Sequence, residues 1–580
     1  MRFLGISKYN KKLLQLKFQS KPDILRKCST KESYLHNFGS EPFQYLNVGQ
    51  VLKSTALKYP DRESIISCNE RTRLTFSETL YKVDKLAAGF MNLGLQKGDR
   101  VGIWSPNYEF WYITMLAIAR SGLVCVALNP AYQLPELEYC LNKVGVKAIV
   151  APEVFRKQKH YEILMNLVNR NSTSSLKHVI IASDKKLLNA KRYRDVLDIA
   201  SESDIAEIDK LQSSISPNTC YNIQFTSGTT GKPKAARLSH FSLVNCGYDM
   251  GKRQELNLRY SRICVNNPLF HGYGIIITIM NCLNHGATMI LPSPHFNPEE
   301  SLQAIVNENC NIIYGTPTMF VDLISKQREL NVNLPSINIA NTAGAICTPN
   351  LVKDIQKHLN VTKVRSIYGL TETTAAVFQS LPNDENETLE NSVGYISDHT
   401  EVKVVDGSGN PVPFGQPGEL CIRGYMTLLD YYDDVEKTKE VLGVDQWFKT
   451  GDQFVLYENG YANIVGRLKE MIIRGGENIY PREIEDFLNT HPDIKETHVV
   501  GIPDERMGEE VGAFIRLKER SKSVTLNDVR KFCEGRLSHF KIPRFVVIVE
   551  EFPRTLSGKI QKYKFVDVFK NELEDAIKSN

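Results

Sequence analysis

Short apolar segments alternate with segments of helix length from about residue 45 to residue 400. Ten of the apolar segments follow one another: RVGIWS, LVCVAL, KAIVAP, HVIIAS, YNIQFT, ICVNN, ATMILP, NIIYG, INIANTAG and KVRSIYG. Strands that are separated by helices pair in parallel, and the helices then cover both faces of the sheet. The pattern therefore predicts an α/β fold, with a large N-terminal region of parallel sheets covered by helices.

Beyond about residue 400 the pattern changes to that of hairpins. The segments EVKVVDGSGNPVPFGQPGELCIRG and QFVLYENGYANIVGR contain the turn sequences DGSGN and ENG, which predict a small β-rich subdomain. After Arg467 the chain has roughly 110 residues of mixed helix and strand pattern, enough for a separate domain. We therefore expect an N-terminal domain over residues 41–466 and a C-terminal α+β domain over residues 467–580.

Two longer apolar stretches, 111–128 and 273–291, have some of the character of membrane spans. Polar residues interrupt both, among them Arg120 in the first and Asn281 in the second, whereas a span needs about twenty predominantly apolar residues. Each stretch is better interpreted as a buried helix, a glycine turn and a buried strand. No transmembrane segment is predicted.

Positive charge is concentrated at the N-terminus. Residues 1–31 contain nine Lys or Arg residues and one acid, Asp23, which gives this segment a charge of +8. Because the whole chain carries +5, the remainder carries −3. A nucleic-acid-binding domain is expected to be basic, so the body of the protein is not predicted to bind nucleic acid.

The basic N-terminal segment resembles a mitochondrial transit peptide. It is poor in acids, and Leu13, Leu14, Leu16 and Phe18 lie among its basic residues. We expect residues 1–40 to be such a leader and the protein to act in the mitochondrial matrix; an ordinary basic tail is the alternative. The twelve cysteines include no C-x-x-C pair, so neither a zinc site nor a disulfide framework is indicated, in keeping with a reducing compartment.

A loop rich in glycine and hydroxyl groups, TSGTTGKPK, follows the strand-like segment YNIQF. Its glycines can direct backbone N–H groups toward an anion, its hydroxyls add donors, and its lysines add positive charge. Such a loop suits the β- and γ-phosphates of a nucleotide. The loop consists of Thr226, Ser227, Gly228, Thr229, Thr230, Gly231, Lys232, Pro233 and Lys234.

A Walker P-loop is the first alternative for this segment. That motif requires G-x-x-x-x-G-K-[ST], but Thr226 stands at the position of its first glycine and Pro233 at the position of its Ser or Thr. The Walker interpretation therefore fails at two positions. A solvated turn without function is the other alternative. The other motifs in the same chain argue against it.

Five motifs occur in the order and approximate spacing of the acyl-adenylate-forming superfamily, which includes acyl-CoA synthetases and beetle luciferases. They are TSGTTGKPK, YGLTET, KTGD, GRLKEMIIRGGENIYPREIE and PRTLSGKIQK, and the resemblance extends from about residue 45 to residue 570. The segments NIQFTSGTTG and IYGTPTMFVDL are most similar to those of the mitochondrial medium-chain acyl-CoA ligases of the acyl-CoA synthetase family member 2 type.

The resemblance implies a reaction in two steps. A fatty acid carboxylate attacks the α-phosphate of MgATP, giving acyl-AMP and pyrophosphate, and the thiol of coenzyme A then displaces AMP. The substrates would be a medium-chain fatty acid, ATP and coenzyme A, with Mg²⁺ as the metal ion. Residues 41–466 would form the AMP-binding domain, and residues 467–580 the mobile C-terminal AMP-binding domain.

The resemblance also implies roles for the nucleotide-binding residues. Tyr368 and Gly369 would flank adenine on one side, and Gly344 and Ala345 of NTAGA on the other, although a lone tyrosine more often packs in a core. The remaining roles concern phosphate, metal and ribose. Thr371 would contact the α-phosphate, Glu372 would help to hold Mg²⁺, Asp452 would accept hydrogen bonds from the ribose hydroxyls, and Arg467 would bind ribose or phosphate.

Five further residues follow from the same resemblance. Lys559 would bridge the substrate carboxylate and the α-phosphate during the first step, and Lys469 would be the hinge about which the C-terminal domain turns. Gly475 and Gly476 of RGGEN would then admit the thiol arm of coenzyme A. His271 of PLFHGYG is a candidate for the acyl pocket, and a core histidine bonded to backbone is its alternative.

The sequence departs from the family pattern at three places. Ala235 follows GKPK where glycine is usual, Arg237 stands where a smaller or apolar residue is common, and Glu470 replaces a frequent aspartate. None of these changes removes an expected ligand. Arg237 could tighten nucleotide binding or pair with a nearby acid.

Two other functions compete with a medium-chain acyl-CoA ligase. One is an adenylating enzyme with another acid, such as an aromatic acid, or another acceptor; the motif GGEN favours coenzyme A as acceptor. The other is a catalytically dead relative that only binds nucleotide. The presence of Glu372, Asp452, Arg467 and Lys559 argues against it.

Overall fold

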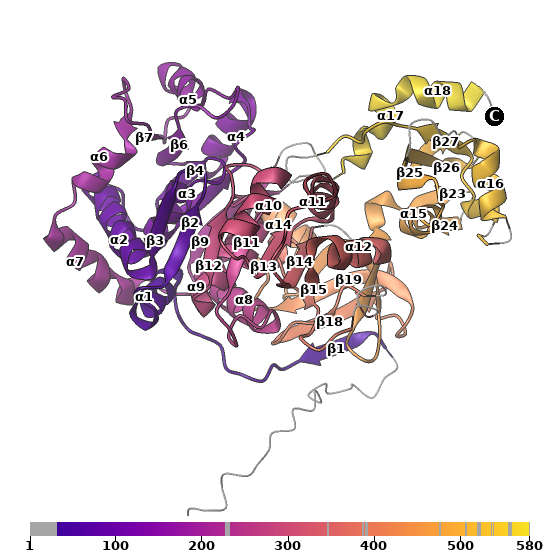
Figure 1. Ribbon diagram of the computed structural model, residues 1–580, viewed down its shortest axis with the longest axis horizontal. Coiled ribbons are helices and arrows are strands. Elements are labelled where there is room, and N and C mark those ends of the chain that lie inside the picture. Colours follow the sequence, from indigo (N-terminus) through magenta and orange to yellow (C-terminus); the bar gives the residue numbers. More distant parts are fainter. Residues whose placement is uncertain are drawn as a thin grey trace, which may run out of the picture.

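Two large sheets, a small antiparallel sheet and a separate C-terminal sheet make up the protein (Figure 1). The computed structural model describes residues 32–226, 233–344, 347–385, 388, 392–474, 477–504, 507–518, 524–534, 536–537, 539–554 and 560–578. The predicted α/β architecture with a β-rich subdomain and a C-terminal α+β part is confirmed.

The first large sheet has the strand order β20-β10-β9-β5-β4-β6-β7-β8. Its strands from β9 to β8 are parallel, whereas β10 and β20 add to the β9 edge in antiparallel pairing. The strand bounds are Arg100–Trp104 for β4, Val124–Leu128 for β5, Ala148–Pro152 for β6, His178–Ala182 for β7, Lys191–Arg192 for β8, Cys220–Thr226 for β9, Lys234–Ser239 for β10 and Asp430–Tyr431 for β20.

The second large sheet has the order β17-β16-β15-β14-β13-β11-β12-β2-β3. Its six central strands, from β15 to β2, are parallel. The strand bounds are Glu63–Ser67 for β2, Thr72–Thr75 for β3, Arg262–Val265 for β11, Thr288–Leu291 for β12, Ile312–Gly315 for β13, Ile337–Ala343 for β14, Val361–Tyr368 for β15, Phe378–Gln379 for β16 and Tyr395–Ile396 for β17.

Helices lie between the two sheets and on both outer faces. The largest core cluster joins both sheets through α1, α2, α3, α8 and a π-helix, and the outer layers are α4 with α5 and α10 with α11 and α12. The helix bounds are Val48–Lys58 for α1, Phe76–Asn92 for α2, Glu109–Arg120 for α3, Leu134–Val144 for α4, His160–Asn169 for α5, Tyr193–Asp198 for α6, Glu202–Leu211 for α7, His240–Arg253 for α8, Tyr273–Met280 for the π-helix, Asn281–His285 for α9, Pro298–Asn307 for α10, Pro317–Leu330 for α11 and Pro349–Leu359 for α12.

All ten apolar segments predicted as strands are strands, and the two long apolar stretches divide as expected. The first contains α3 and then β5, and the second contains the π-helix, α9 and then β12. The side chain of Arg120 is fully buried. Its charge is compensated by a bidentate ion pair with Asp84, in which Nε lies 2.6 Å from Oδ1 and Nη2 lies 2.8 Å from Oδ2. Within the described ranges, no helix combines the length and the apolar composition that a membrane crossing requires.

The small sheet is antiparallel throughout, in the order β1-β18-β19-β21-β22. Its strands are Tyr34–Asn37 for β1, Thr400–Val405 for β18, Pro417–Gly424 for β19, Phe448–Leu456 for β21 and Ala462–Arg467 for β22, and α14 covers Val435–Val441. β1 comes from residues assigned to the leader by sequence, yet it forms the edge of this sheet beside β18.

The C-terminal part has its own sheet, in the order β24-β23-β26-β25, with β27 beside β26, and its own apolar clusters. It lies beside α11 and α12 (Figure 1). The short 3₁₀ helix Leu468–Glu470 connects it to β22. Its elements are Ile472–Arg474 for β23, Glu477–Ile479 for β24, Pro481–Leu488 for α15, Ile494–Asp504 for β25, Gly508–Leu517 for β26, Leu526–Cys533 for α16, Phe545–Ile548 for β27, Phe565–Val568 for α17 and Lys570–Lys578 for α18.

Candidate active site

The carboxyl ends of four neighbouring parallel strands bring the predicted motifs together. Val265 of β11 pairs with Tyr314 of β13, Gly315 pairs with Thr342 of β14, and Ala343 pairs with Ile367 of β15. The segments that leave these strands are therefore neighbours at one edge of the sheet. In open α/β sheets this edge is where ligands bind.

The predicted phosphate loop connects β9 to β10, and Thr226 and Lys234 form the last pair of this antiparallel hairpin. Ser227 to Lys232 lie outside the described residues, so the structure places the two ends of the loop. The loop leaves the first large sheet, whereas the motif YGLTET leaves the second. A direct contact joins them.

Glu372 is the meeting point of these segments. Its Oε1 atom accepts a hydrogen bond from the hydroxyl of Thr226 at 3.0 Å and another from the phenol of Tyr431 at 2.8 Å. Burial, and next the Glu372 carboxylate, raises the pKa of Tyr431 well above its usual value, so the phenol stays protonated and donates. The ammonium of Lys234 lies 4.7 Å from the centre of the Tyr431 ring.

Sequence reasoning missed β20, the two-residue strand that carries Tyr431. In the β10–β20 pair Arg237 stands opposite Asp430, and its guanidinium binds both carboxylate oxygens, with Nε 2.5 Å from Oδ1. Of the two alternatives for Arg237, tighter nucleotide binding or pairing with a nearby acid, the structure shows the pairing. The only signal in the sequence was the segment LLDYYDD, whose Asp430 lies 193 residues after Arg237.

The residues expected around the nucleoside also converge. The phenol of Tyr368 donates to Oδ2 of Asp452 at 2.7 Å, and its ring meets Phe454 edge-on at 4.6 Å between ring centres. Asp452 is only 3% exposed, and it stands opposite Arg467 in the β21–β22 pair. Two motifs that lie 84 residues apart, YGLTET and KTGD, are thus joined by a hydrogen bond.

Gly369 lies where a side chain would collide with backbone. A Cβ atom on this residue would come within 2.3 Å of the carbonyl of Ala375, so the turn after β15 requires glycine. The following 3₁₀ turn, Thr371–Thr373, leaves Thr371 and Glu372 half-buried. Gly344 follows β14 with a φ of +83°, a conformation that glycine adopts without strain.

His271 adjoins this region and is exposed, so it is not the core histidine that was its alternative. Its Nδ1 atom accepts a hydrogen bond from the backbone N–H of Tyr273 at 3.2 Å. A Cβ atom on the next residue, Gly272, would lie 3.4 Å from the side chain of Gln224 on β9. The segment that carries His271 therefore runs beside the strand that leads into the phosphate loop.

Several expected site residues lie outside the described residues. For Arg467 and Lys469 only the backbone is described: Arg467 ends β22, and Lys469 lies in the 3₁₀ helix that follows. The roles of all these residues stay predictions. The residues outside the description are Ser227, Gly228, Thr229, Thr230, Gly231, Lys232, Ala345, Gly475, Gly476 and Lys559.

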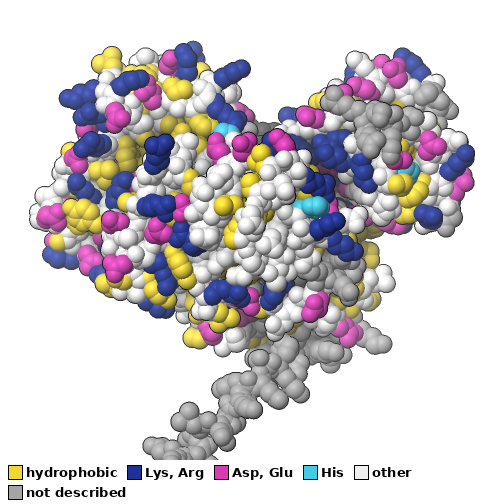
Figure 2. Space-filling view, in the orientation of Figure 1, with side chains coloured by type: hydrophobic (Ala, Val, Ile, Leu, Met, Phe, Trp, Pro, Cys, Tyr) yellow, Lys and Arg dark blue, Asp and Glu magenta, His cyan; other side chains and the backbone are white. Residues whose placement is uncertain are grey.

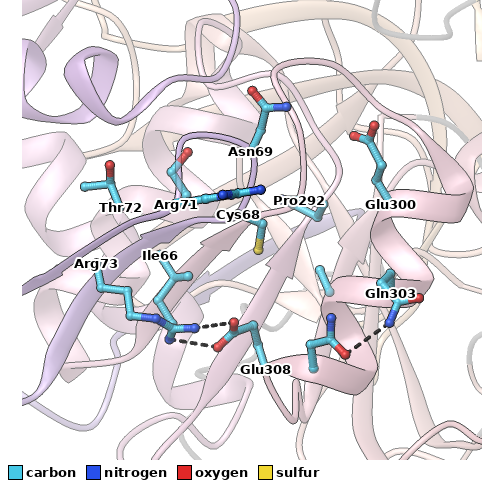
Figure 3. Close-up of a pocket in the computed structure, with 13 residues that line it drawn as sticks. Ile66, Cys68, Asn69, Arg71, Thr72, Arg73, Pro292, Glu300, Gln303 and Glu308 are labelled. Carbon is cyan, nitrogen blue, oxygen red and sulfur yellow. Dashed lines mark hydrogen bonds and ion pairs between the residues drawn. The ribbon is translucent and has the colours of Figure 1, made fainter.

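A cavity of about 420 Å³ lies elsewhere, between the β2–β3 hairpin and α10 (Figure 3). Its lining includes Arg71, Glu300 and the ion pair of Arg73 with Glu308, in which Nη1 lies 2.9 Å from Oε2. None of its lining residues is a predicted site residue. The charged lining does not suit an alkyl chain, because charges paired with each other would lose their hydration.

Comparisons with known proteins identify relatives of this chain. The AMP-binding enzyme family matches residues 52–432, and the AMP-binding enzyme C-terminal domain matches residues 483–559. The chain is 41% identical over 544 residues to the mitochondrial medium-chain acyl-CoA ligase ACSF2 of Danio rerio, covering 92% of this chain and 90% of that one. The human protein of the same name is 40% identical over 582 residues, covering 97% and 94%.

Solved structures show the same fold. An anthranilate CoA ligase with bound anthranoyl-AMP superposes with a TM-score of 0.80 at 23% identity, covering 92% of this chain and 98% of that one. The fatty acyl CoA synthetase of Mycobacterium tuberculosis superposes with a TM-score of 0.69 at 25% identity, covering 90% and 98%. The fold class inferred from the strand pattern is thereby confirmed.

Proposed function

The chain belongs to the AMP-binding enzyme family, and from this premise we propose that it joins medium-chain fatty acids to coenzyme A in two ATP-dependent steps. A fatty acid carboxylate attacks the α-phosphate of ATP, which forms the acyl–phosphate bond of acyl-AMP and releases pyrophosphate. The thiol sulfur of coenzyme A then attacks the acyl carbon, giving the thioester and AMP. The junction of Thr226, Glu372 and Tyr431 is the observation that best supports this proposal, because it joins the phosphate loop to an acidic residue.

We assign the nucleotide-binding residues to the first step. The loop between Thr226 and Lys234 binds the departing phosphates, and Thr371 contacts the α-phosphate. Tyr368 flanks adenine, and Asp452 accepts hydrogen bonds from ribose, for which the phenol of Tyr368 orients its carboxylate. Since Asp452 is almost fully buried, the ribose hydroxyls meet a fixed acceptor with little competing water.

Mg²⁺ fits the oxygen atoms at Glu372. Magnesium is usually held by one or two carboxylates together with the phosphates of the substrate, and Glu372 supplies a carboxylate beside the hydroxyl of Thr226. Among the described residues no group of three or more His, Cys, Asp and Glu side chains is arranged to hold a metal ion, so the phosphates and water would complete its shell. When bound, Mg²⁺ neutralises negative charge on the phosphates.

The C-terminal residues complete the proposal. Lys559 offsets the negative charge that builds between carboxylate and α-phosphate, Lys469 is the hinge, and Gly475 and Gly476 admit the thiol of coenzyme A. We place the AMP-binding domain at residues 41–466 and its mobile C-terminal partner at residues 467–580. The relatives named mitochondrial support a mitochondrial location, and we propose the matrix as the compartment.

The dependence of activity on the chain length of the fatty acid is the sharpest test of the proposed function. We expect an optimum at about C6 to C12, because each buried CH₂ group adds about 0.8 kcal/mol of binding until the tunnel is filled. The measurement is CoA-dependent release of AMP with acids from C2 to C18 and with benzoate. Activity confined to acetate, to the longest acids or to benzoate would assign the enzyme to another acid. Release of no pyrophosphate with any acid would favour a binding protein.

A further inference from the structure

The C-terminal domain touches the larger body at the first turn of α11. The Nη1 atom of Arg554 donates a hydrogen bond to the hydroxyl of Thr318 at 2.9 Å. Thr318 is the second residue of α11, whose N-cap Thr316 directly follows the last residue of β13, Gly315. The contact therefore connects the C-terminal domain to the segment YGTPTMF at the edge of the candidate active site.

Arg554 is anchored on its own side by Glu496 of β25. Its Nη2 atom lies 2.7 and 2.8 Å from the two carboxylate oxygens of Glu496, which also binds Arg516 at 3.2 Å and Nε2 of His498 at 3.0 Å. Burial acts to raise the pKa of Glu496, but its bond to His498 and the charge of Arg554 outweigh burial and lower the pKa to about 2. The anchor therefore stays ionised at every physiological pH.

Charge complementarity extends along the same helix. Asp322 lies four residues after Thr318, one turn further along α11, where Arg554, Lys495 and Arg516 attract its carboxylate and Glu496 repels it. Figure 2 shows Lys and Arg side chains gathered where the C-terminal domain meets the larger body. The first half of α11 thus offers a hydroxyl and a carboxylate to a basic face of the C-terminal domain.

We propose that Arg554 and Thr318 are positioning residues, which hold the C-terminal domain against α11 while acyl-AMP forms and separate before coenzyme A reacts. The inference rests on the two-step function proposed above. Arg554 is the second residue of the motif PRTLSGKIQK, so its contact with Thr318 keeps the start of this motif beside the larger body. The motif RGGEN belongs to the same domain, and the proposed function requires the domain to turn so that this motif serves the second step.

The contact is suited to a reversible role. Arg554 keeps its bonds to Glu496 when it leaves Thr318, so the guanidinium is not stranded without a partner as the domain turns. Within the described ranges, the bond to Thr318 is the hydrogen bond between the domains that Arg554 gives up. The acceptor on the larger body is a neutral hydroxyl, which water can satisfy at once.

The test compares Thr318→Val with Thr318→Ser, which keeps the hydroxyl, and with Ser325→Ala, which alters an exposed residue on the same helix. Acid-dependent exchange of pyrophosphate into ATP measures the first step, and conversion of supplied acyl-AMP and CoA measures the second. We expect Thr318→Val to slow the first step about fivefold and to leave the second unchanged or faster, while the other two variants behave as wild type. Equal loss in both steps, or no loss, would overturn the proposal.

A cross-link tests the contact independently of activity. In the double variant Thr318→Cys with Arg554→Cys, a short bis-methanethiosulfonate reagent, whose spacer replaces the length of the arginine side chain, should link the two thiols, because a direct disulfide requires Cα atoms within about 7 Å. Dithiothreitol should reverse the link, and neither single variant should show it. The cross-linked enzyme should lose at least about tenfold of its thioester-forming rate, because the domain can no longer turn. Failure to cross-link would refute the contact. A wild-type enzyme that forms no acyl-AMP would instead refute the proposed function, while the cross-link would still report on the contact.

Discussion

At the scale of single residues, Glu372 shows how distant parts of the chain make one site. Its carboxylate is bound by Thr226, 146 residues earlier, and by Tyr431, 59 residues later. The sequence motifs predicted Thr226 and Glu372, because each lies in a contiguous run of residues with its own chemical character. Tyr431 could not be predicted, since its role depends on a strand pairing that no local pattern indicates.

The Tyr431 phenol gives a test of this junction. We expect Tyr431→Phe to lower kcat/KM for MgATP about tenfold, because the carboxylate of Glu372 loses a donor of about 1.4 kcal/mol and turns more freely. Pyrophosphate exchange at varied Mg²⁺ concentration is the measurement. Tyr432→Phe is the matched control, since that ring lies near Arg237 and, in the described part of the chain, makes no hydrogen bond to Glu372. If Tyr431→Phe keeps the Mg²⁺ dependence of the wild type, Tyr431 has no role in the site.

Lys559 is tested by separating the two half-reactions. Attack of a carboxylate on a triphosphate brings negative groups together, and only a positioned cation offsets their repulsion. We expect Lys559→Ala to slow acyl-AMP formation by roughly 10²- to 10³-fold and to convert supplied acyl-AMP and CoA at a rate near that of wild type. Equal loss in both half-reactions would argue against domain alternation, and unchanged rates would exclude Lys559 from the site.

At the scale of elements, the interior strands were predictable and the edge strands were not. Strands such as β5 and β6 are continuous apolar runs because helices cover both of their faces. β20 is two residues long, and β10 is antiparallel beside a parallel sheet, so neither has such a pattern. These edge strands carry Arg237, Asp430 and Tyr431, which explains why this side of the site was missed.

The N-terminal edge strand sets a limit on processing of the leader. We propose that the leader ends before residue 32, although the sequence pattern placed its end near residue 40. β1 pairs with β18 over residues 34–37, the phenol of Tyr34 donates to Glu401 at 2.7 Å, and Leu35 is 1% exposed. Cleavage after residue 40 would remove this strand and expose an edge of the sheet.

Truncated proteins test this limit. We expect removal of residues 1–31 to leave thermal unfolding unchanged, whereas removal of residues 1–40 should lower stability by at least about 2 kcal/mol through loss of Leu35 burial alone. Differential scanning fluorimetry with light scattering measures both effects. The natural N-terminus, found by mass spectrometry of protein from mitochondria, should lie at or before Glu32. A natural N-terminus beyond Asn37 would contradict the limit.

At the scale of the whole molecule, helices between two sheets create an extensive core that holds titratable groups. The strand order and the packing of α2, α3 and α8 between the sheets could not be predicted from local patterns, because both depend on contacts between distant segments. Burial lowers the pKa of His240 to about 3 and the pKa of His160 and of His285 to about 4. All three histidines are therefore neutral in the folded protein near neutral pH.

These buried histidines predict that acid weakens the fold well above the pH at which carboxylates titrate. Below about pH 6.5 the unfolded chain gains protons on these residues and the folded protein does not, so stability falls as the pH falls toward 4. At pH 5 each of these histidines lowers the free energy of unfolding by about 2 kcal/mol relative to its value at neutral pH. We expect the unfolding temperature to drop between pH 7 and pH 5, and His285→Gln to reduce this dependence. Calorimetry across this range is the measurement, and an equal pH dependence in wild type and His285→Gln would show that His285 does not contribute to it.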